Sequence, residues 1–165
     1  MRPTARFDQL LVISPGISPG ARPFPEGSER RPLQATAMEI HAVSTTDAPA
    51  ALGPYSQAIR CGDTVYVSGQ VPIVPGTGKL LDAGIREQTF QLFVNIRAIL
   101  EAAGASLSTV VKVTIFIADW NDFAAFNAAY AEIFTEPYPA RSTIQNTRPL
   151  GALVGADVIA TIPAH

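Results

Sequence analysis

The sequence is poor in cysteine and histidine. Its 165 residues include one cysteine, Cys61, and two histidines, His41 and the terminal His165. A single cysteine excludes a disulfide within the chain and indicates a reducing compartment, so we expect a cytoplasmic protein. The histidines form no cluster with metal-ligand spacing and no Ser-His-Asp or Cys-His set, so we expect neither a metal nor another cofactor. Catalysis would then depend on carboxylates, arginine, tyrosine, backbone groups and water.

Charged residues are also few, at 16%, and the formal net charge is −2. Because no basic stripe is present to neutralise a phosphate backbone, nucleic acid is not an expected partner. The apolar runs are too short to span a bilayer, so we expect no membrane segment. A hydrophobic content of 47% predicts one globular domain with a substantial core. So little surface charge further indicates that part of the surface is buried against a partner chain.

Residues 1–37 differ from the rest because they contain six prolines and three glycines, too many for a helix or a central strand. We interpret them as a flexible N-terminal extension, or an upstream addition, to a domain at 38–165. Five arginines leave a mitochondrial targeting segment open as an alternative, although Asp8, Glu26 and Glu29 argue against it.

The pattern from Met38 onward predicts alternating strands and helices. The clearest helix is 85–103, where Ile85, Leu92, Ile96 and Ile99 recur at helical steps and Gly104 is a natural stop. A second helix is expected at 122–134, capped by Asp119 or Asn121, with Phe123, Phe126, Tyr130 and Phe134 on its buried side. Strands are expected at 39–43, 58–60, 65–68, 110–117, 141–145 and 153–162, with a loop at 72–78.

Within the expected strand 110–117, Val111, Val113, Ile115 and Ile117 alternate with polar residues and should share one face. The order β-β-β-α-β-α-β-β predicts an α+β fold with both helices on one face of a mixed sheet. A partner subunit is the expected cover for the other face.

Five motifs occur in order between about Ala48 and Ile162, and together they resemble one family. They are GPYSQA at 53–58, SGQVP at 68–72, the helix end from Asn95 to Gly104, the N-D-F-x-x-x-N-x-x-Y pattern at 121–130, and PARS at 139–142. The chain is identified by them as a member of the RidA family, also called the YjgF family. The resemblance implies a chorismate-mutase-like fold, a homotrimer with sites at the subunit interfaces, and cofactor-free hydrolysis of 2-imino acids to 2-keto acids and ammonia.

Arg141 is the candidate substrate clamp. A guanidinium offers paired N–H donors that match a carboxylate, giving both energy and orientation. The resemblance implies that Tyr55, Gly69 and Asn127 line the same pocket, with Tyr55 and Arg141 taking part in catalysis. Tyr55 could instead be a packing aromatic, Gly69 a strand-end kink and Asn127 a helix residue bonded to a loop. Thr143, two residues beyond Arg141, should share its face of the strand and could place its hydroxyl in the same pocket as a substrate-binding group.

The last strand departs from the family. Imine-hydrolysing members carry there a glutamate thought to position the hydrolytic water, whereas this chain has Gly155, with Asp157 matching a second acidic position. Losing a positioned general base costs on the order of 10²–10⁴ in rate. Either Asp157 substitutes for the glutamate through a shifted register, or the chain acts on another small carboxylate. A non-catalytic carboxylate-binding trimer is the alternative from a different class, and a nuclease has the least support.

Overall fold

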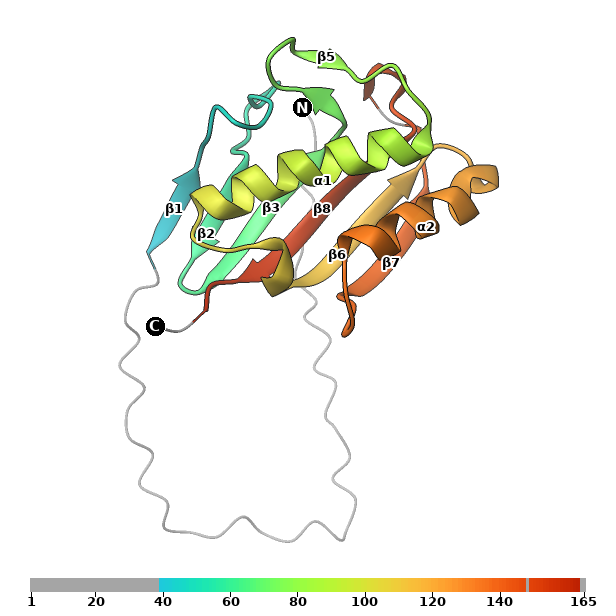
Figure 1. Ribbon diagram of the computed structural model, residues 1–165. Coiled ribbons are helices and arrows are strands. Elements are labelled where there is room, and N and C mark those ends of the chain that lie inside the picture. Colours follow the sequence, from blue (N-terminus) through green and yellow to red (C-terminus); the bar gives the residue numbers. More distant parts are fainter. Residues whose placement is uncertain (1–38, 148, 164–165) are drawn as a thin grey trace, which may run out of the picture. The chain divides into compact units, whose positions relative to one another are not determined.

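The computed structural model describes residues 39–147 and 149–163, and in them two helices cover one face of a six-stranded sheet (Figure 1). The predicted extension at residues 1–37 lies outside these ranges. The sheet has the order β1-β2-β3-β8-β6-β7, in which only β6 and β7 run parallel. This mixed sheet with its two helices confirms the expected α+β fold. The strands are β1 (Ile40–Val43), β2 (Ala58–Cys61), β3 (Thr64–Gln70), β6 (Val110–Ile117), β7 (Ala140–Gln145) and β8 (Val154–Thr161).

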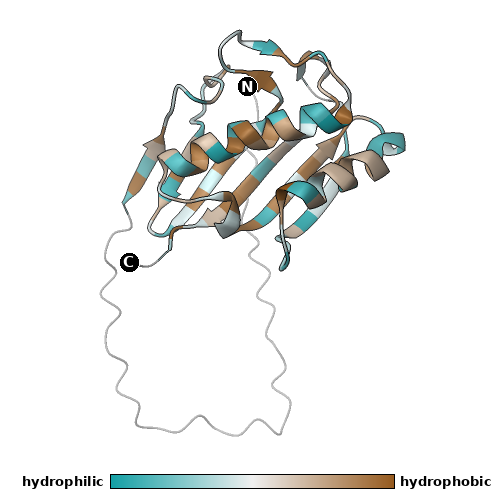
Figure 2. Ribbon diagram, viewed as in Figure 1, coloured by the Kyte–Doolittle hydropathy of each residue, from teal (hydrophilic) through white to brown (hydrophobic). Residues whose placement is uncertain are grey.

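Helix α1 (Ile85–Ala102) lies across the sheet with its apolar stripe inward, and Figure 2 shows hydrophobic and hydrophilic bands alternating along it. Leu92, Phe93 and Ile96 are essentially inaccessible to solvent. The helix ends in a Schellman motif, because the N–H groups of Gly104 and Ala105 donate to the carbonyls of Glu101 and Leu100, at 3.1 and 2.9 Å. Gly104 has φ of +84°, the left-handed conformation that such an ending requires, as the sequence predicted.

Helix α2 (Phe123–Ile133) lies beside α1, and its N-terminus is preceded by the short 3₁₀ turn η2 (Trp120–Asp122). The side chain of Asp119 accepts a hydrogen bond from the N–H of Asn121, so Asp119 caps this turn. The N-cap of α2 itself is Asp122, whose side chain makes no capping hydrogen bond, so the prediction that Asp119 or Asn121 caps the helix was wrong. Phe126, Tyr130 and Phe134 are buried against α1 and the sheet, as the spacing predicted. Two further 3₁₀ turns are η1 (Leu107–Thr109) and η3 (Pro149–Gly151).

Two further local predictions were wrong. Val111 is 48% exposed and does not share the buried face of Val113, Ile115 and Ile117. The pairing of β6 with β8 shifts register between Val110 and Lys112, and such an irregularity interrupts the alternation of side chains. The predicted loop at 72–78 also contains the first strand of a small hairpin, β4 (Ile73–Val74) with β5 (Lys79–Leu80).

Three buried amide side chains fix the loops around this framework. Gln57 binds the segment before it, since its Oε1 accepts from the N–H of Thr45 at 2.7 Å and its Nε2 donates to the carbonyl of Pro49 at 2.8 Å. Asn95 on α1 donates to the carbonyl of Ile73 at 2.8 Å. Gln88 on α1 accepts from the N–H of Leu153, immediately before β8, at 2.9 Å. Because satisfied buried amides specify one geometry, these loops are held in place by the core.

No helix in the described part of the chain is long and apolar enough to cross a membrane.

Candidate functional site

Arg141 lies near the start of β7 and points to the side of the sheet that the helices cover. It is paired in the parallel ladder with Val113, and Thr143 is paired with Ile115. Val113 and Ile115 belong to the core beneath the helices. Since residues opposite one another in a ladder share a face, Arg141 and Thr143 both face the helices, as their spacing predicted.

One face of α2 surrounds the Arg141 guanidinium. Phe123, Phe126, Asn127 and Tyr130 follow one another at steps of three, one and three residues, which places them along a single stripe of the helix. The guanidinium carbon lies 4.7 Å from the ring centroid of Tyr130, 5.4 Å from that of Phe126 and 5.9 Å from that of Phe123. The Nη2 group donates to Oδ1 of Asn127 at 2.8 Å. We call these four α2 residues the arginine cradle.

The cradle holds the guanidinium without neutralising it. Cation–π contacts and an amide oxygen attract a cation but carry no net charge. Within residues 39–147 and 149–163 the ion pairs are Arg86 with Glu132 and His41 with Glu39, so Arg141 has no carboxylate partner there. Asn127 uses one N–H of the five that a guanidinium offers. The other four have no hydrogen-bond acceptor among the described residues and could donate to an anion.

A cavity of about 410 Å³ opens beside the guanidinium. Its walls combine the clamp with aromatic and small apolar groups: Asn127, Tyr130, Ala131, Tyr138, Pro139 and Arg141. One cation in a mostly apolar wall is the arrangement expected for a small organic acid. The structure therefore brings Arg141 and Asn127 together, as the motifs implied. The sequence pattern predicted Tyr130 on the buried side of its helix and at the end of a family motif but indicated no role for it in the pocket, and it did not single out Tyr138.

Tyr130 is 4% exposed, and its hydroxyl has no hydrogen-bond partner among the described residues. Burial raises the pKa of Tyr130 to about 12, and the positive charge of Arg141 opposes this shift. The neutral phenol is thus favoured in the folded state, while the tyrosine of the unfolded chain ionises with its ordinary pKa of about 10. Stability is therefore unaffected by this group below pH 10 and decreases as the pH rises from 10 towards 12.

We expect Tyr130→Phe to remove this loss of stability at alkaline pH, because phenylalanine has no hydroxyl proton to release. Its free energy of unfolding should fall less than that of the wild type between pH 10 and 12, by up to about 2 to 3 kcal/mol. Urea titrations at pH 8, 10 and 12 measure the difference between the two proteins, which cancels the titration of other groups. Equal slopes for both proteins would contradict the assignment.

Tyr55 and Gly69 lie on other elements. Tyr55 is 47% exposed, and its hydroxyl accepts a hydrogen bond from the N–H of Leu52 at 3.0 Å. It lines a separate cavity of about 510 Å³. Gly69 lies in β3 where the pairing with β8 is irregular, and a Cβ atom added there would meet nothing within 4 Å. Within one chain, the described lining of the Arg141 cavity includes neither of these residues, nor Thr143.

Gly155 and Asp157 lie on the opposite side of the sheet from Arg141. Along β8, Val154, Ala156 and Val158 are in the core beneath the helices. Gly155 and Asp157 alternate with these residues and therefore face away from the helices, opposite Phe116 and Thr114 of β6. We call this side, represented by Gly155, Asp157, Phe116 and Thr114, the open face. One chain thus does not bring Asp157 to the Arg141 clamp.

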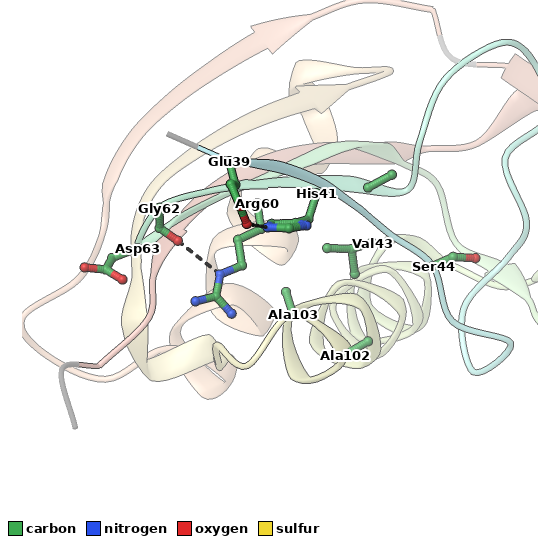
Figure 3. A pocket seen from close by; sticks show the side chains of 10 residues that line it. Glu39, His41, Val43, Ser44, Arg60, Gly62, Asp63, Ala102 and Ala103 are labelled. Carbon is green, nitrogen blue, oxygen red and sulfur yellow. Dashed lines mark hydrogen bonds and ion pairs between the residues drawn. The ribbon is translucent and has the colours of Figure 1, made fainter. Parts of the chain in front are cut away.

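A larger cavity, of about 670 Å³, lies at the other end of the sheet beyond the C-terminus of α1 (Figure 3). Arg60 enters it, but its Nε donates to the carbonyl of Gly62 at 3.0 Å. Glu39 and Asp63 line the same cavity. Two carboxylates and the negative end of a helix disfavour an anion, so this cavity is a weaker candidate than the one beside Arg141.

Comparisons with known proteins agree with the fold and the motifs. The family model described as Endoribonuclease L-PSP matches residues 45–162. The RutC family protein PH0854 of Pyrococcus horikoshii is 47% identical over 119 residues, covering 72% of this chain and 94% of that protein. The 2-iminobutanoate/2-iminopropanoate deaminase of Capra hircus is 44% identical over 119 residues, covering 72% and 87%. The crystal structure of Escherichia coli TdcF with bound serine superposes with a TM-score of 0.70 at 38% identity, covering 74% and 99%.

Proposed function

The chain belongs to the family of endoribonuclease L-PSP and RidA-type proteins, and from this premise we propose that it hydrolyses 2-imino acids to 2-keto acids and ammonia. The observation that carries the proposal is the Arg141 guanidinium, held beside a cavity by the arginine cradle with its charge uncompensated in the described chain. Relatives named 2-iminobutanoate/2-iminopropanoate deaminase at 43–48% identity support the same reaction.

In the proposed reaction, Arg141 binds the substrate carboxylate through paired N–H donors and so orients the adjacent C=N bond. Water adds to the imine carbon and its proton moves to nitrogen, giving a carbinolamine. This intermediate then expels ammonia and leaves the 2-keto acid. No redox step is involved, so the proposal includes no cofactor.

We further propose that the complete site forms between copies of the chain. Arg141 and Thr143 face the helices, whereas the position of the expected glutamate, Gly155, faces away from them. Residues on opposite sides of one sheet can meet only if a second copy brings its open face to the clamp. Tyr55 and Gly69 would join the site in the same way. A homotrimer is the arrangement that the resemblance implies, and light scattering should give three times the 17.5 kDa chain mass.

The proposed function has a direct test. Threonine and a dehydratase generate 2-iminobutanoate in solution, and the decay of the imine and the release of the keto acid are followed with and without the protein. We expect the protein to accelerate release. No acceleration, with full folding and assembly, would contradict the deaminase.

A second candidate is favoured by Gly155, because the resemblance implies a water-positioning glutamate at this position. The chain could then bind, or act on, a different small carboxylate while retaining the clamp. Tight binding of 2-keto acids without imine hydrolysis would favour this candidate. RNA cleavage has less support, because a net charge of −2 does not favour a phosphate backbone.

The substitution Asp157→Ala tests whether Asp157 replaces the missing glutamate or whether the chain has another substrate specificity. If Asp157 replaces the missing glutamate, the substitution should lower kcat by about 10²-fold or more, because a general base is lost. If Gly155 marks another specificity, the rate should change less than twofold. Both rates come from the same imine assay, with Asp157→Asn as the isosteric control.

We also propose a cellular location from the sequence. A single cysteine and the absence of a long apolar run favour the cytoplasm. Residues 1–37 remain a proposed extension to a domain at 38–165, with mitochondrial targeting as their alternative role.

A further inference from the structure

We propose that Tyr138 selects the substrate's side chain, and that the site prefers 2-imino acids whose side chains are bulky and apolar or aromatic. This inference rests on the proposed function of the Arg141 site. It adds a specificity-determining residue and a substrate class to that function.

Tyr138 has a large aromatic side chain that contributes little to the packing of the described chain. It is 49% exposed, and in the described residues it takes part in no hydrogen bond and no ring contact. It nevertheless lines the same cavity as Arg141. A single exposed aromatic needs no explanation, but one that forms a wall beside an unpaired cation is well placed to contact a ligand.

The backbone holds Tyr138 in a restricted position. Pro137 precedes it and Pro139 follows it, and Pro139 lines the cavity as well. Proline fixes its own φ and restricts the residue before it, so this segment loses little entropy when a ligand orders it. The phenol ring, which has two side-chain torsions, therefore offers contact area at a low conformational cost.

The chemistry of the walls defines the substrate class. Once the carboxylate is bound by Arg141, the rest of the ligand has the rings of Tyr130 and Tyr138 and the small groups of Ala131 and Pro139 around it. On this side of the site, which one chain builds, these residues include no carboxylate and no second cation. A charged side chain would lose its hydration there without gaining a partner, whereas an apolar one gains contact.

The experiment compares two substrates in three proteins. An L-amino-acid oxidase generates the imines of alanine and phenylalanine, and kcat/KM is measured for the wild type, Tyr138→Ala and Tyr138→Phe. We expect Tyr138→Ala to lower kcat/KM about tenfold for the phenylalanine-derived imine and less than twofold for the alanine-derived imine. Tyr138→Phe should retain both values, because the ring and not the hydroxyl makes the contact.

Binding gives a readout that is independent of catalysis. The Kd values of phenylpyruvate and pyruvate are measured by calorimetry for the same proteins, and Tyr138→Ala should weaken phenylpyruvate selectively. If the wild type binds phenylpyruvate selectively but hydrolyses no imine, the proposed function fails while the inference on Tyr138 stands. An equal loss for both ligands, no loss for either, or no binding of either ligand to the wild type would overturn the inference.

Discussion

Replacing Arg141 with alanine should lower kcat/KM for 2-iminobutanoate on the order of 10²- to 10³-fold. The guanidinium is the only charged group among the described residues that line its cavity, so a substrate carboxylate would lose its partner. Truncating one side of a desolvated charge pair costs about 2–5 kcal/mol, which sets this range. The same imine assay, run at several substrate concentrations, measures the change.

Two controls separate the clamp from a general effect of charge. Arg141→Lys keeps the charge but loses the paired donors and the flat face that stacks on Tyr130, so most of the activity should still be lost. Arg97→Ala removes an exposed arginine from α1 and should leave kcat/KM within twofold. Full activity in both Arg141 variants would refute the proposed role of the clamp.

Replacing Phe93 with alanine should destabilise the fold by about 3–5 kcal/mol. Phe93 is 1% exposed and makes edge-to-face contacts with Tyr130 and Phe134, at centroid distances of 5.8 and 5.2 Å. It therefore joins α1 to the helix that supports Arg141. The loss of the ring leaves a cavity at this junction, and urea unfolding monitored by circular dichroism measures the cost.

Val94→Ala is the matched control on the same helix. Val94 is 45% exposed, so its truncation should change the free energy of unfolding by less than about 0.5 kcal/mol. The two substitutions share the helix propensity of alanine and differ mainly in burial. A Phe93→Ala protein as stable as Val94→Ala would contradict the packing described here.

The long periodic elements were predictable because each has one buried face. The apolar steps of α1 and the stop at Gly104 define that helix from sequence alone, and the structure confirms both. The hairpin of β4 and β5 was missed because two-residue strands are too short to show a period. Val111 was misplaced because the register shift beside it depends on the partner strand, which no local pattern reveals.

The site was only partly predictable. The motifs indicated Arg141 and Asn127, and the structure places them in contact. Phe123, Phe126 and Tyr130 were correctly expected on the inner side of α2. Their spacing from Asn127 places all four residues on one stripe of the helix, and this spacing was the signal that they could surround Arg141. That Gly155 and Arg141 face opposite sides of the sheet could not be predicted, because it depends on the pairing of three strands.

The arginine cradle also has a practical consequence for work at the bench. The Arg141 guanidinium stays positively charged, so its cavity should bind the carboxylate of a buffer component as well as that of a metabolite. Acetate, formate and citrate should therefore occupy it, raising the apparent melting temperature while acting as competitive inhibitors. Activity measured in a buffer without carboxylates should be higher than activity measured in these salts.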